Sequence, residues 1–82
     1  MLTTGNQLRA ARALIEMDQT DLAARAKLSV NTIQNMERSG ARPIAGRSAN
    51  VQRVQAVLET AGIEFLNGNE PGVRLKRKPR RR

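Results

Sequence analysis

Only three residues, Lys27, Leu28 and Ser29, separate two short stretches of helical pattern in the middle of this 82-residue chain. The first stretch, 19–26, places apolar side chains at helical spacing behind Asp18, a good N-cap. The second, 30–38, repeats the pattern behind Ser29, and Gly40 is suited to end it. A short helix, a tight turn and a second short helix form a helix-turn-helix arrangement. This spacing constrains the fold more than any other feature.

The remaining segments complete a mainly α fold. Two further helical patterns cover 6–17 and 49–61, with Ser48 as N-cap of the latter, and a loop over 41–47 precedes it. Apolar and polar residues then alternate on both sides of a Gly/Asn/Pro loop over 67–72, which predicts a β-hairpin. We therefore expect a four-helix domain over 1–62, a hairpin over 63–76 and a basic tail over 77–82 that is disordered alone. The apolar stripe of the first helix is Leu8, Ala11, Leu14 and Ile15.

The composition excludes several classes of function. The chain has no Cys and no His, so disulfides, thiolate or imidazole zinc sites and His-based catalysis are all excluded. We expect no enzyme activity, no cofactor and no metal. No apolar run approaches the roughly 18 residues that a membrane span needs. The N-terminal residues do not resemble a signal peptide, so we expect a cytoplasmic protein.

Positive charge is concentrated at the C-terminal end. The net charge is +8, but seven of the fifteen basic residues lie in 74–82, and residues 1–73 carry eight basic against seven acidic residues. Such a tail indicates a polyanionic partner, with nucleic acid ahead of an anionic membrane surface, since the tail has almost nothing apolar to insert. Phe65 is the only aromatic residue, which argues against single-strand binding by base stacking.

The segment 19–40, "QTDLAARAKLSVNTIQNMERSG", resembles the Cro/CI-type (phage-repressor-like, XRE) helix-turn-helix family. The resemblance covers about residues 6–62. One position departs from the family pattern, because Lys27 stands in the turn where Gly is usual; a left-handed Lys costs roughly 1 kcal/mol relative to Gly. The matching positions are Gln19, Leu22, Ala23, Leu28, Ser29, Ile33 and Glu37.

The resemblance implies that the helix over 30–38 lies in the major groove of double-stranded DNA. Amides suit that position, because Asn or Gln can form a bidentate pair with adenine. A single amide is more often an ordinary solvated residue, but the set within this motif favours base reading. The residues expected to read bases are Val30, Asn31, Thr32, Gln34 and Asn35, where Val30 packs on a thymine methyl. Those expected to contact phosphates are Gln19, Arg38, Arg42 and Arg47, with plain surface charge as the alternative for the arginines.

The resemblance also implies a structural ion pair. In this family the Glu near the end of the second motif helix pairs with a basic residue of the first helix, and Glu37 and Arg12 occupy these positions. A lone carboxylate among core residues is costly. We therefore expect a buried or half-buried pair that orients the helix over 30–38 against the first helix.

The hairpin is the expected dimerisation element. A two-stranded hairpin is marginal in isolation, and so is a core of this size. We expect its apolar face to be covered by the helix over 49–61 or by a partner's hairpin. A homodimer of this kind binds an inverted repeat with half-sites about 34–36 Å apart, or a multiple of that distance. The residues of this face are Ile63, Phe65, Val73 and Leu75.

These features predict a sequence-specific, double-stranded-DNA-binding transcriptional regulator, a repressor, that acts as a homodimer. The alternative is an antitoxin or anti-activator whose main partner is another protein, with DNA binding secondary. Only a hairpin and a basic tail follow the fourth helical pattern, so the chain offers no extension of the kind that wraps a toxin. This favours the DNA-binding regulator.

The tail generates a first prediction. Its residues Arg77, Lys78, Arg80, Arg81 and Arg82 are expected to follow phosphates or enter a narrow minor groove; the alternatives are a solubilising end or a nuclear-localisation-like run. Each phosphate neutralised contributes about 0.9 to the log–log salt slope. Removing 77–82 should therefore flatten that slope by several units and weaken binding to all DNA alike. Salt titrations of the full-length and truncated proteins measure this, and identical slopes would show that the tail makes no contact.

Overall fold

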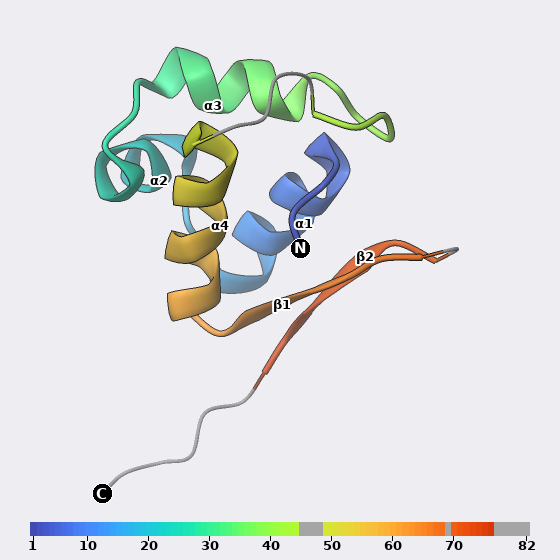
Figure 1. The fold of residues 1–82 in the computed structure, drawn as a ribbon. Coiled ribbons are helices and arrows are strands. Elements are labelled where there is room, and N and C mark those ends of the chain that lie inside the picture. Colours follow the sequence, from blue (N-terminus) through green and yellow to red (C-terminus); the bar gives the residue numbers. More distant parts are fainter. Residues whose placement is uncertain (45–48, 69, 77–82) are drawn as a thin grey trace, which may run out of the picture.

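The chain folds into a helical domain followed by an antiparallel hairpin in the computed structural model, which describes residues 1–44, 49–68 and 70–76 (Figure 1). The predicted mainly α class with a C-terminal hairpin is confirmed. Ser48, Arg47 and the tail 77–82 lie outside the described residues. The elements within them are α1 (Gly5–Ile15), α2 (Gln19–Ala26), α3 (Val30–Glu37), α4 (Ala49–Thr60), β1 (Ile63–Leu66) and β2 (Gly72–Leu75).

Each of the first three helices begins at a side chain that caps it. In each, an oxygen of the capping residue accepts a hydrogen bond from the backbone N–H three residues later. Asp18 and Ser29 are the caps that the sequence predicts. Thr4 is a third, and it forms a reciprocal capping box with Gln7. These local contacts set the starts of the helices before any tertiary packing is considered.

Left-handed residues end the first two helices. Glu16 takes φ 55° and stops α1 at Ile15, two residues short of the predicted end. The prediction was too long because the apolar pattern continues into Met17, which then belongs to the link to α2. Lys27 takes φ 60° at the turn, as a helix-turn-helix with a non-glycine turn residue requires.

One core joins all four helices and the hairpin. Leu14, expected in the apolar stripe of α1, is instead 44% exposed, because it lies at the edge of that stripe, farther round the helix from Leu8 and Ile15 than Ala11 is. Leu2 lies in the core although it precedes every predicted element. The largest fully buried side chains are Leu8, Leu22, Ile33, Val54 and Leu58.

The hairpin belongs to this core. In β1, Ile63 and Phe65 are only 3% and 8% exposed. The prediction that these two residues lie at a dimer interface is therefore corrected: they are already covered within one chain. Opposite them in the register, Val73 is half-buried and Leu75 is exposed.

The other face of the hairpin carries an ion pair and the exposed side chain of Leu66. Glu64 and Arg74 are cross-strand partners there, and a hydrogen bond from Arg74 lowers the pKa of the Glu64 carboxyl. This polar pair marks the side of the hairpin that faces solvent.

Gln7 ties the hairpin to α1. This buried side chain accepts hydrogen bonds from the backbone N–H groups of Thr3 (2.8 Å) and Thr4 (3.1 Å). Its amide group donates to the carbonyls of Leu66 (2.9 Å) and Gly72 (3.2 Å). All of these bonds are made by one side chain. The loop end of the hairpin, where Leu66 pairs with Gly72, is therefore held by polar contacts as well as by apolar packing.

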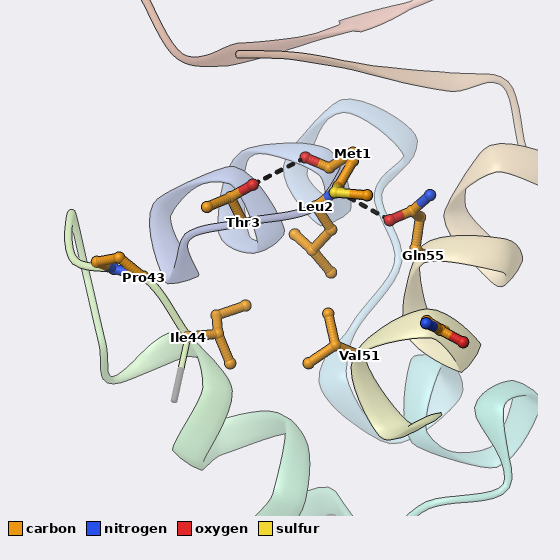
Figure 2. Close-up of a pocket in the computed structure, with 8 residues that line it drawn as sticks. Met1, Leu2, Thr3, Pro43, Ile44, Val51 and Gln55 are labelled. Carbon is orange, nitrogen blue, oxygen red and sulfur yellow. Dashed lines mark hydrogen bonds between the residues drawn. The ribbon is translucent and has the colours of Figure 1, made fainter. Parts of the chain in front are cut away.

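The N-terminal segment fills the space between α4 and the chain that follows α3. The Ile44 N–H donates to the Thr3 carbonyl, and the Leu2 N–H donates to the Gln55 side chain. Figure 2 shows Leu2, Ile44 and Val51 pointing toward one another across a pocket of about 250 Å³.

Gly5 permits the close approach of α1 to the end of α3. A Cβ added at Gly5 would lie 2.6 Å from the Glu37 carbonyl oxygen and 2.7 Å from that of Met36. Both atoms belong to the backbone, so they cannot move aside as a flexible side chain can. The start of α1 therefore fits against α3 only with glycine.

This contact reverses the usual effect of alanine in a helix. Gly5→Ala should lower the free energy of unfolding by about 1–3 kcal/mol through overpacking, whereas the same change in a helix interior normally stabilises by roughly 0.5–1 kcal/mol. Gly72→Ala is the control, since nothing lies within 4 Å of its added Cβ; it should change stability by less than about 0.5 kcal/mol. Urea unfolding measures both. A Gly5→Ala protein as stable as the parent would mean that α1 and α3 are further apart.

Candidate nucleic-acid interface

The candidate interface is the exposed face of α3, which α2 and α1 hold from behind. Helices α2 and α3 pack against each other across the three-residue turn, α2 also packs on α4, and α1 packs on α3. Figure 1 shows α3 lying along one edge of the molecule, with the hairpin along the opposite edge. One long side of α3 is therefore free of other described elements.

The inner and outer faces of α3 differ sharply in chemistry. Ile33, Met36 and Glu37 are buried. Asn31 and Asn35, one turn apart, are exposed and lie on the same side of the helix. Gln34 is exposed on the flank. Of the predicted base-reading residues, the structure thus brings three amides together on solvent-facing surface.

The other two predicted base-reading residues, Val30 and Thr32, are half-buried. Val30 is half-buried and packs against the core, so little of it is left to meet a thymine methyl. Thr32 is also half-buried, and its hydroxyl lies 2.9 Å from that of Ser29 in the cap of α3. Val30 packs on the core and Thr32 contacts the N-cap, so both contribute less to the exposed face of α3 than the amides do.

Glu37 and Arg12 meet where α1 and α3 cross. Arg12 donates from Nε to Glu37 Oε2 (2.6 Å) and from Nη2 to Oε1 (3.0 Å), a two-pronged contact. The Glu37 side chain is 5% exposed and that of Arg12 is 20% exposed. Arg12 also donates to the Met17 carbonyl (3.0 Å), so one guanidinium joins α1, α3 and the α1–α2 link.

Gln19 faces inward more than the phosphate prediction requires. Its Nε2 donates to Glu37 Oε1 (2.9 Å), and its Oε1 accepts from Gln34 Nε2 (3.3 Å). A carboxylate can only accept, so Glu37 dictates which end of the Gln19 amide it meets. A polar chain thus runs from Arg12 through Glu37 and Gln19 to the flank of α3.

The predicted phosphate-binding arginines fall into two groups. Arg38 is exposed at the end of α3 and donates to Asn35 Oδ1 (2.6 Å). Arg42 is exposed in the following turn. Arg47 and the tail residues lie outside the described chain, so their predictions have no structural counterpart here.

Arg9, which the sequence analysis did not single out, joins the same cluster. Its Nε lies 4.0 Å from Glu37 Oε1, and its side chain is 60% exposed. Arg9 precedes Arg12 by three residues, which places both on one face of a helix. That spacing was the available signal.

The chain matches no protein-family model, and no curated protein is significantly similar to it. Among the described residues no group of acidic side chains is arranged to hold a metal ion. No helix in the same residues is long and apolar enough to cross a membrane.

The Arg12–Glu37 geometry yields a stability prediction. Arg12→Met leaves a buried carboxylate facing Gln19 and the distant Arg9, and one-sided loss of a buried pair costs about 3–5 kcal/mol. We expect the free energy of unfolding to fall by about 3 kcal/mol, since Arg12 is partly exposed. The double variant Arg12→Met/Glu37→Met should lose less, because no charge is left unpaired.

Arg25→Ala is the matched control for an exposed pair. Arg25 contacts Asp21 at 3.0 Å on α2, and their side chains are 60% and 48% exposed. Its loss should cost about 0.3–0.5 kcal/mol. If Arg12→Met proved as mild as Arg25→Ala in urea unfolding, Glu37 would not depend on Arg12.

Proposed function

We propose that the chain is a sequence-specific, double-stranded-DNA-binding regulator that reads the major groove with α3. The observation that carries the proposal is the distribution of polar groups on this helix. Its exposed face offers amides, while Glu37, the only acid in its sequence, is turned inward and neutralised. A surface with base-pairing groups and no negative charge suits a polyanion.

Two further features support DNA over other partners. Amides can read the donor and acceptor pattern of base edges in the major groove, and Asn31 and Asn35 stand one turn apart along one face. Arg38 and Arg42 follow at the end of the helix, where exposed cations can meet phosphates. The chain continues to a strongly cationic C-terminal segment, which adds sequence-independent attraction.

The resemblance to the Cro/CI-type helix-turn-helix family agrees with this proposal at the α2–turn–α3 unit. Asp18, Lys27 and Ser29 give that unit its two helix starts and its left-handed turn. We propose membership of this family and repression as the mode of regulation, since occupying an operator is enough to exclude other proteins from it.

We also propose that the regulator is a homodimer. Leu75 at the end of β2 is 44% exposed, and Val73 beside it is half-buried. With Ile63 and Phe65 withdrawn into the core, the remaining apolar surface of the hairpin is small. The hairpin lies on the edge opposite α3 (Figure 1), so pairing there would leave α3 of each copy uncovered.

Asn31→Ala tests the proposed function. The variant should lose roughly 1–3 kcal/mol of discrimination at one base pair and keep the stability of the parent. Selection from a random duplex library, followed by titration of the selected site, measures this. Asn67→Ala, an exposed amide at the hairpin loop, is the control and should leave the base preferences unchanged.

Two results would contradict the proposal. Failure of the parent protein to enrich any sequence would favour the protein-binding alternative. Equal losses by Asn31→Ala on selected and random duplexes would make Asn31 a general contact.

A further inference from the structure

Arg38 fixes the orientation of the Asn35 amide. The Arg38 Nη1 donates to Asn35 Oδ1 at 2.6 Å, and both side chains are exposed at the outer side of α3. A guanidinium has donors and no acceptor. The oxygen of the amide must therefore face Arg38, and the NH₂ group forms no hydrogen bond within the described residues.

Asn31 provides the contrast on the same helix. It is exposed one turn earlier, and its side chain forms no hydrogen bond to the residues that the structure describes. Asn31 can therefore present both its oxygen and its NH₂ group to a base. The two asparagines share a residue type and a face but differ in what they offer.

We propose that Asn35 and Arg38 act together as a donor-only unit that selects guanine at one base pair. This inference rests on the proposed DNA-binding function of α3. Guanine presents two acceptors, N7 and O6, in the major groove, whereas adenine presents the N7 acceptor and an N6 amino donor. The NH₂ of Asn35 and the free N–H groups of Arg38 complement two acceptors.

Adenine fits this unit poorly. In the usual bidentate pair the asparagine oxygen accepts from adenine N6; here Arg38 uses one of the two lone pairs of that oxygen, so its remaining N–H donors and its charge lie beside the place of the adenine amino group. Adenine would place its amino donor against these N–H groups, whereas guanine O6 would accept a hydrogen bond from one of them. The adenine pairing expected from the sequence for Asn35 is therefore replaced by guanine, and Asn31 retains the adenine pairing.

If Arg38 only contacted a phosphate, its loss would have a different effect. Loss of a phosphate contact weakens binding to all sequences by a similar factor and lowers the salt slope by about one unit. Loss of an orienting residue changes which base is preferred at one position. Base preference therefore separates the two roles, whereas affinity alone does not.

The test is selection from a random duplex library with the full chain and four variants. Asn35→Ala identifies the base pair that Asn35 contacts, because preference is lost there. Arg38→Met removes the donor, and Arg38→Lys keeps a cationic donor. Arg42→Met is the control, since Arg42 is an exposed cation in the next turn. Melting temperatures check that each variant folds.

The parent should prefer guanine over adenine at that position by about tenfold, which is within the range for a good base contact. Arg38→Met should erase or invert this preference, Arg38→Lys should keep it, and Arg42→Met should weaken binding without changing it. An unchanged guanine preference in Arg38→Met, or adenine selected by the parent, would overturn the inference while leaving the proposed function intact. A parent that enriches no sequence would overturn the proposed function, and this inference with it.

Discussion

A buried carboxylate lies where three helices of this small protein meet. Glu37 of α3 takes two hydrogen bonds from Arg12 of α1 and one from Gln19 of α2. A charge at this depth is tolerated only with such partners, and they must be held in place. The rotation of α3 about its own axis is thereby tied to the two helices behind it. That rotation decides which residues of α3 reach solvent.

Helix α1 contacts both α3 and the hairpin. Its Gly5 lets the backbone of α3 approach closely, and its Arg12, about two turns further along the same face, binds Glu37. Gln7, between them in sequence, holds the hairpin through the carbonyls of Leu66 and Gly72. The hairpin is therefore part of the same folding unit, and Leu66 and Leu75 are its exposed apolar side chains.

Local signals made much of this fold predictable. The caps at Asp18 and Ser29 and the two-residue alternation of the hairpin depend on neighbours in sequence, so the elements could be read directly. The positions of Leu2, Leu14 and Phe65 could not, because they depend on which surface another element covers. Of the site, the outward Asn31 and Asn35 follow from the period of the helix. The contacts of Gln19 and of Arg38 arise from side chains that only the fold brings together.

The central claim is that the outer face of α3 lies against DNA. Titrating ¹⁵N-labelled protein with a selected duplex, and following its amide signals by nuclear magnetic resonance, tests this residue by residue. The account predicts that the side-chain NH₂ signals of Asn31 and Asn35 and the backbone signals of α3 change most, while those of β1 stay in place. Changes centred on the hairpin, with α3 unaffected, would contradict it.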